Sequence, residues 1–294
     1  MSEARHLSTF RQQLLSNGPW LVITGAGISA ASGIPTYRDH QAKWLRSNPI
    51  THQAFLSSDT QRRRYWMRSY FGWPSVQLAR PSPAHQALVV LEQNQLFTGL
   101  ITQNVDRLHQ QAGHQEVLDL HGRLDRVRCL QCDRFESREQ VQQRLANLNS
   151  AYSDLNPPLN PDGDAAVNDA LVTDFQIVSC IHCQGVLMPD VVFYGGTLAA
   201  STHQQAANYY AAAKALLIIG SSLMVYSAYR FCKQAAADQK PIVLLNQGCT
   251  RADGLATKLL RVDCQTFLPQ LAASVQKQCA ATNCDKLENS PYSD

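Results

Sequence analysis

Short apolar runs that end in glycine or a polar residue recur along this chain of 294 residues. The first run, Trp20–Thr24, leads directly into a glycine. We predict strands at 20–24, 99–102, 117–120, 215–220 and 242–246, and helices at 5–16, 83–93 and 225–237. Because buried parallel strands are apolar throughout and are joined by helices, this alternation predicts an α/β fold with a Rossmann-type doubly wound parallel sheet.

The alternation stops between about residues 123 and 190, where the chain becomes polar and rich in proline. We therefore predict a small module inserted into the larger α/β unit. The expected units are a Rossmann-type domain at 1–122 and 191–275, a module at 123–190 and a loosely ordered tail at 276–294.

Four of the nine cysteines form two tight pairs, Cys129 with Cys132 and Cys180 with Cys183. Two turns of the form Cys-x-x-Cys supply four thiolates, which is the ligand set of a closed, structural zinc site. Free thiols or a redox pair are the alternative. We predict that one structural zinc ion holds the inserted module together and does not touch the substrate.

Composition excludes some classes of function. A net charge of +3 and a pI near 8.4 are too mild to require nucleic acid as a partner. No apolar run is long enough to span a membrane, and the N-terminus has no signal-peptide pattern. We therefore expect a cytoplasmic protein with no membrane partner.

The first predicted strand ends in Gly25-Ala26-Gly27. Glycine lets the backbone turn tightly and approach a pyrophosphate, whose charge the N–H groups of the following helix would bind. The pattern lacks the third glycine of the full dinucleotide motif, so a plain strand-to-helix turn remains an alternative. Farther along, Tyr37 offers a ring to cover a base or ribose. Arg38 is either a phosphate ligand or a solvated loop cation.

Polar residues also follow the later strands, at the edge where doubly wound sheets bind ligands. Asn104 and Asp106 can hydrogen-bond a carboxamide such as that of nicotinamide, and His121 can act as a general base near neutral pH. A cap on the next helix and a structural histidine are the plainer interpretations. The same edge is expected to hold Gly220, Ser221, Ser222, Asn246, Gln247 and Gly248, with Cys264 ending one more short strand.

These residues together resemble the sirtuin family of NAD-dependent protein deacylases. The matching blocks, in order, are GAGISAASGIPTYR at 25–38, TQNVD at 102–106, LHG at 120–122, the two cysteine pairs, GSSLMVYSAYRF at 220–231 and Asn246. The blocks RYWMRSYFGWP at 64–74 and VYSAYRF at 225–231 are most similar to the subgroup that includes the mitochondrial class II sirtuins.

The resemblance implies that NAD and an acyl-lysine protein or peptide meet between a Rossmann-type domain and a small zinc domain. The acyl oxygen would attack the nicotinamide ribose and release nicotinamide, and His121 would then activate a ribose hydroxyl. The products would be free lysine, nicotinamide and O-acyl-ADP-ribose, so NAD is consumed. The catalytic residues would be His121, Asn104 and Asp106. The NAD site would comprise Gly25, Ala26, Gly27, Ser29, Tyr37, Arg38, Gln103, Asn104, Asp106, Gly220, Ser221, Ser222, Asn246, Gln247, Gly248 and Cys264.

The substrate peptide is expected to add as a strand between the two domains. Its site would comprise Tyr65, Arg68, Val191, Val192, Phe193, Leu223 and Val225. Tyr65 and Arg68 lie on one helical face and resemble the pair that recognises acidic acyl groups in desuccinylating sirtuins, although a packing aromatic and a surface cation would have the same spacing. Ala31, Thr36 and Gly196 depart from the family pattern, and Gly196 follows the expected substrate edge.

Three other functions fit parts of this pattern. A protein mono-ADP-ribosyltransferase would need the same NAD site but would yield no O-acyl-ADP-ribose. A non-catalytic module that binds NAD or ADP-ribose would not need His121, Asn104 and Asp106. An NAD-dependent dehydrogenase is disfavoured, because no acidic ribose ligand follows the first glycines at the expected distance.

Overall fold

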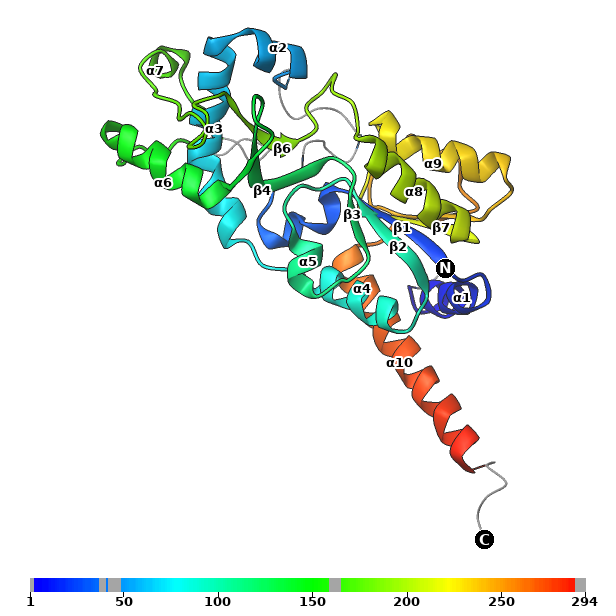
Figure 1. The fold of residues 1–294 in the computed structure, drawn as a ribbon. Coiled ribbons are helices and arrows are strands. Elements are labelled where there is room, and N and C mark those ends of the chain that lie inside the picture. Colours follow the sequence, from blue (N-terminus) through cyan, green and yellow to red (C-terminus); the bar gives the residue numbers. More distant parts are fainter. Residues whose placement is uncertain (1–2, 37–40, 42–48, 159–164, 289–294) are drawn as a thin grey trace.

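The computed structural model describes residues 3–36, 41, 49–158 and 165–288. Its main sheet has six strands in the order β3-β2-β1-β7-β8-β9, and every neighbouring pair is parallel (Figure 1). The strands are β1 (Trp20–Thr24), β2 (Phe97–Thr102), β3 (Val117–Asp119), β7 (Ala215–Ile219), β8 (Ile242–Leu245) and β9 (Lys258–Leu260). The predicted Rossmann-type parallel sheet is confirmed, and each predicted strand is present with slightly shifted ends.

The strand order reverses beside β1. From β1 the chain proceeds outward through β2 to β3, and it later returns on the other side of β1 as β7, followed by β8 and β9. In such sheets the connections leave the reversal point in opposite directions, which opens a crevice at the carboxyl ends of the two central strands. The topology therefore directs attention to the residues that follow β1 and β7.

Alternating side chains of the central strands enter two separate cores, one on each face of the sheet. Trp20 and Val22 of β1 pack into the core that includes Phe10 and Phe267, whereas Leu21 faces the opposite core. Helices α1 (Glu3–Ser16), α4 (Pro83–Gln93) and α10 (Cys264–Glu288) cover the first face, and α8 (Ala200–Ala212) and α9 (Tyr226–Ala237) cover the second.

A second, antiparallel sheet has the order β5-β4-β6 (Figure 1). Its strands are β4 (Gly122–Cys129), β5 (Phe135–Ser137) and β6 (Leu187–Val191), accompanied by α6 (Arg138–Leu148), η3 (Ser150–Tyr152) and α7 (Asp169–Val172). The core beside this sheet also contains Phe55 of α2 (His52–Ser57) and Trp66 of α3 (Asp59–Leu78). Packing thus joins α2 and α3 to the smaller unit, although we expected residues 1–122 to belong to the larger one.

The expectation that Cys264 ends a short strand is wrong, because Cys264 is the first residue of α10. The strand there is β9, and Asp263 caps the helix by accepting a hydrogen bond from the backbone N–H of Gln265 at 3.0 Å. Helix α10 also continues to Glu288, into the segment expected to be loosely ordered, and Figure 1 shows its end projecting away from the sheet. No glycine or proline interrupts residues 270–288, so the composition favours helix there.

The remaining short elements are η1 (Ala26–Ile28), η2 (Ala30–Ser32), α5 (Leu108–Ala112) and η4 (Asp253–Leu255). Among the residues that the structure describes, no helix is both long and apolar enough to cross a membrane.

Candidate active site

The glycines after β1 lie against the turn after β7, at the point where the strand order reverses. The backbone N–H of Gly27 donates to the carbonyl of Gly220 at 2.8 Å. A Cβ atom at Gly27 would lie 2.8 Å from Cα of Gly220, and a Cβ at Gly25 would lie 2.8 Å from Cβ of Ser221. Both positions therefore need glycine, because any larger residue would force the two turns apart.

A cavity of about 860 Å³ opens at this edge of the sheet. It is large enough for a dinucleotide together with part of a second ligand. The predicted site residues that line it are Gly25, Ala26, Gly27, Tyr65, Arg68, Gln103, Asn104, His121, Val191, Val192, Phe193, Gly220, Ser221, Ser222, Leu223, Val225, Asn246, Gln247, Gly248 and Cys264. Ser29 and Asp106 are not in its lining, and the predicted residues Tyr37 and Arg38 lie outside the described part of the chain.

Asn104 is held in place by a chain of hydrogen bonds that ends at Asp106. The amide Nδ2 of Asn104 donates to the carbonyl of Gly25 (3.2 Å) and to Oγ of Ser29 (3.0 Å). Ser29 Oγ in turn donates to Oδ2 of Asp106 at 2.7 Å. The other carboxylate oxygen of Asp106 accepts from the backbone N–H of Leu108, the first residue of α5, at 2.9 Å. Burial raises the pKa of Asp106. Through Ser29, Asp106 holds Asn104 in position from behind the cavity wall.

Gln103 connects the carboxyl ends of β1 and β7. Its side-chain Nε2 donates to the carbonyl of Thr24 (3.2 Å) and to Oγ of Ser221 (2.7 Å). These bonds fix the polar strand ends relative to one another across the reversal point. The sequence placed Gln103 in the site, and the structure gives it this bridging position.

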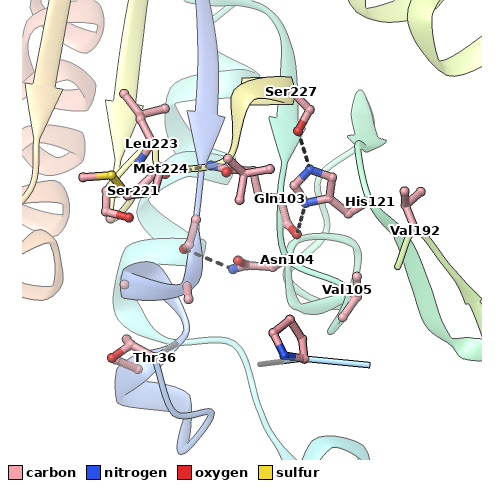
Figure 2. Close-up of a pocket in the computed structure, with 18 of the residues that line it drawn as sticks. Thr36, Gln103, Asn104, Val105, His121, Val192, Ser221, Leu223, Met224 and Ser227 are labelled. Atoms are coloured by element: carbon pink, nitrogen blue, oxygen red, sulfur yellow. Dashed lines mark hydrogen bonds between the residues drawn. The ribbon is translucent and has the colours of Figure 1, made fainter. Parts of the chain in front are cut away.

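His121 follows β3 and lies between two protein partners (Figure 2). Its Nδ1 is 3.1 Å from the carbonyl oxygen of Gln103, and its Nε2 is 2.7 Å from Oγ of Ser227. Burial lowers the pKa of His121 below its ordinary value, and the hydrogen bond to Gln103 opposes that shift. The ring is therefore neutral at neutral pH, as a proton acceptor must be.

The far wall of the cavity comes from the ends of β8 and β9 and the start of α10. Asn246 directs its Nδ2 to the carbonyl of Gly248 at 2.8 Å, which shapes the turn after β8. Burial raises the pKa of the Cys264 thiol to about 12, so this residue stays an uncharged thiol at physiological pH.

Tyr65 and Arg68 of α3 also line the cavity. Their exposed fractions are only 7% and 6%, so Arg68 is not a surface cation. The Tyr65 ring contacts the rings of Phe55 and Phe193, with centroids 5.6 Å and 5.2 Å apart. Tyr65 therefore packs as an aromatic residue and also faces the cavity.

The four paired cysteines come together in the smaller unit. Their sulfur atoms all lie within 4.8 Å of one another, with Cys129 and Cys183 at 3.4 Å and Cys132 and Cys180 at 3.7 Å. These separations exclude disulfides, and they match the separation of about 3.8 Å between thiolates that surround one zinc ion in a tetrahedron. The residues therefore fit a structural zinc ion, as predicted.

Sequence reasoning missed several residues of the cavity wall. The most important is Ser227, which contacts His121 directly. It stands in the VYSAYRF block, six residues after Ser221, at the start of the helix predicted at 225–237, and its pattern gave no sign of a contact with His121. The other unpredicted lining residues include Ile50, Val105, Leu124 and Asp263.

Comparisons with known proteins agree with this geometry. Residues 25–227 match the model of the Sir2 family. The chain is 47% identical to NAD-dependent protein deacetylase 2 of Bradyrhizobium diazoefficiens over 84% of this chain and 90% of that protein. It is 42% identical to NAD-dependent protein deacetylase 3 of Pseudomonas syringae pv. tomato over 89% and 93% of the two chains.

Two solved structures have the same fold. A complex of Sir2 with a p53 peptide and NAD+ is 27% identical, with a TM-score of 0.72 over 94% of this chain and 99% of the other. Sir2Tm bound to a propionylated peptide is also 27% identical, with a TM-score of 0.70 over 93% and 98%. Membership of class II stays a prediction, because these matches do not distinguish the classes. The family model matches more than half of this chain, and the relatives are similar over most of it. These findings show that the chain belongs to the Sir2 family.

Proposed function

We propose that this protein is an NAD-dependent protein-lysine deacylase that transfers the acyl group to ADP-ribose and releases nicotinamide. The observation that carries the proposal is the position of His121, which lies in the same cavity as the glycine turn after β1 and the amide of Asn104. This arrangement places a proton acceptor beside a surface suited to a dinucleotide. The curated relatives named NAD-dependent protein deacetylases support the same reaction.

The NAD site is proposed to follow the polar strand ends. The backbone N–H of Ala26, directly after Gly25, would bind the pyrophosphate, and the hydroxyls of Ser221 and Ser222 would contact a phosphate or ribose. Asn104 would bind the nicotinamide carboxamide, and Asp106 would act through Ser29 by holding Asn104 in position.

His121 is the proposed general base. With a lowered pKa, it accepts a proton from a ribose hydroxyl without first losing one of its own. Its backbone carbonyl accepts a hydrogen bond from the N–H of Val192 at 2.8 Å, so the base is tied to the segment proposed to bind the peptide. The peptide would lie between residues 191–193 and 223–225, pairing mainly through its backbone, and many sequences would be accepted.

The acyl group is proposed to enter between the catalytic histidine and α3. Tyr65 and Arg68 are buried there and face the cavity. A guanidinium ion and a phenol hydroxyl suit a distal carboxylate, so succinyl- and glutaryl-lysine are proposed substrates beside acetyl-lysine. Comparing acetyl-, succinyl-, glutaryl- and lipoyl-peptides on the wild type and Arg68→Met tests this. Loss confined to the acidic acyl groups supports recognition by Arg68, and equal loss on all four contradicts it.

The reaction itself is tested by NAD consumption with the same peptide panel, using His121→Tyr as the inactive control. We expect O-acyl-ADP-ribose and free lysine by mass spectrometry. Attachment of ADP-ribose to the protein acceptor without O-acyl-ADP-ribose would instead indicate a mono-ADP-ribosyltransferase. Full activity of His121→Tyr would exclude His121 as the base.

The proposed location is the cytoplasm, where reducing conditions keep the four zinc-ligating thiols available.

A further inference from the structure

Both ring nitrogens of His121 already have hydrogen-bond partners within the protein (Figure 2). The carbonyl of Gln103 can only accept, so the proton of the neutral ring is on Nδ1. Nε2 is then the accepting nitrogen, and the hydroxyl of Ser227 must donate to it at 2.7 Å. The Nδ1–H tautomer satisfies both contacts, whereas the Nε2–H tautomer would lose the bond to the carbonyl of Gln103 and keep only the contact with Ser227.

Ser227 is well placed for this contact. It is the second residue of α9, and it lines the same cavity as His121. The N-cap residue of α9, Val225, provides no side-chain hydrogen bond, so the free N–H groups of the first turn leave a partial positive charge near the ring. That charge disfavours the imidazolium form, in the same direction as burial.

The two hydrogen bonds also fix the orientation of the ring. They bind opposite sides of the imidazole, one from the strand end after β2 and one from the start of α9. A single remaining bond at Nδ1 would leave the ring free to tilt about that contact. A general base loses rate when its accepting lone pair is not aligned with the proton that it takes.

We propose that Ser227 is a positioning residue for His121. The carbonyl of Gln103 fixes the Nδ1–H tautomer, and the hydroxyl of Ser227, by donating to Nε2, holds the ring in orientation until a ribose hydroxyl takes its place at Nε2. This inference rests on the proposed function, because it assumes that His121 is the base. Ser227 does not itself need to contact the reacting atoms.

The test compares Ser227→Ala with Ser227→Thr, which keeps a hydroxyl, and with Ser201→Ala. Ser201 is the matched control, because it is the second residue of α8, is exposed and lies outside the cavity lining. Two steps are measured for each variant. Exchange of labelled nicotinamide into NAD reports the first step, and formation of O-acyl-ADP-ribose reports the step that needs the base.

For Ser227→Ala we expect product formation to slow about tenfold, with nicotinamide exchange and the KM values nearly unchanged. Ser227→Thr should restore most of the rate, and Ser201→Ala should equal the wild type. Equal slowing of both steps in Ser227→Ala, or no slowing at all, would overturn the proposal.

A second readout needs no substrate. In protein labelled with ¹⁵N-histidine, the His121 signals, assigned by their absence from His121→Tyr, should show the Nδ1–H tautomer in the wild type. Ser227→Ala should keep this tautomer, because the bond to Gln103 remains, and its Nε2 signal should shift, because the hydrogen bond from Ser227 is lost. Unchanged ring shifts would refute the positioning role. If the wild type forms no O-acyl-ADP-ribose, the proposed function fails while this measurement still decides whether Ser227 positions the ring.

Discussion

Lowering the pH from 7 to 5 should destabilise this protein through His85, a fully buried histidine in the first turn of α4. The backbone N–H of Ser82 donates to Nδ1 of His85 at 3.2 Å, so that nitrogen must stay unprotonated in the folded state. The rings of His109 and His114 lie nearby, with His109 contacting both neighbours at centroid distances of 4.7 Å and 5.1 Å. Burial, assisted by the charge of His114, lowers the pKa of His85 to about 4.

The size of the effect follows from proton binding in the two states. The unfolded chain has the ordinary histidine pKa near 6.5, so between pH 6.5 and 4 it binds a proton that the folded protein does not. Stability is therefore fully present above pH 6.5 and falls as the pH decreases. For these two pKa values, the free energy of unfolding should drop by about 2 kcal/mol between pH 7 and pH 5 from this residue alone.

The assay is urea denaturation of wild type and His85→Asn at both pH values, with zinc present throughout. The oxygen of asparagine can accept the same bond from Ser82 but does not titrate. Packing losses in the variant are the same at both pH values, so they cancel when the two pH values are compared. The other titrating groups are present in both proteins, so their contributions cancel when the two proteins are compared. The wild type should lose about 2 kcal/mol more than His85→Asn over this range. Parallel losses in the two proteins would refute the argument that His85 is buried in the neutral form.

Three further outcomes follow from packing and metal binding. Gly27→Ala should lower NAD affinity, and overpacking against Gly220 should lower stability by about 1–3 kcal/mol, measured by calorimetric titration and urea denaturation. Chelation of zinc should unfold the smaller unit and lower the melting temperature of the protein. Cys183→Ser should purify without bound zinc, as measured by atomic absorption. A protein that is equally stable without the metal would contradict the structural role of zinc. Phe175→Ala, at a fully buried position, should lower the free energy of unfolding by about 3–5 kcal/mol. Phe135→Ala, at a half-exposed position, should lower it by about 1 kcal/mol or less. Similar losses in the two variants would contradict the burial of Phe175 in this core.

The sequence predicted correctly those features that depend on residues close together along the chain. The central strands β1, β7 and β8 are buried along their whole length, so each one is an almost continuous apolar run that can be recognised without knowing its neighbours. The cysteine pairs were equally clear, because Cys-x-x-Cys spacing brings two thiolates to one turn. The start of α10 was missed although Asp263 is a helix-capping residue, because the short β9 lies just before it.

Contacts between distant segments could not be predicted in the same way. Residues of α3 precede the first cysteine pair by more than fifty positions, and only packing shows that Trp66 shares a core with the zinc module. The different positions of Asn104 and Asp106 could not be predicted either, because they also depend on contacts between distant segments. Sequence placed Asn104 and Asp106 together, whereas the structure puts Asn104 at the cavity and Asp106 behind it, linked through Ser29.

The sequence by itself determined the kinds of groups available: a glycine turn after a buried strand, polar strand ends, one histidine and four paired thiols. These follow from local backbone geometry and from the chemistry of single side chains. The tertiary structure alone decided that Ser227, more than a hundred residues from His121, completes the environment of the base. The physical reason is that a hydrogen bond depends on a distance of about 3 Å in space, which separation along the chain does not specify.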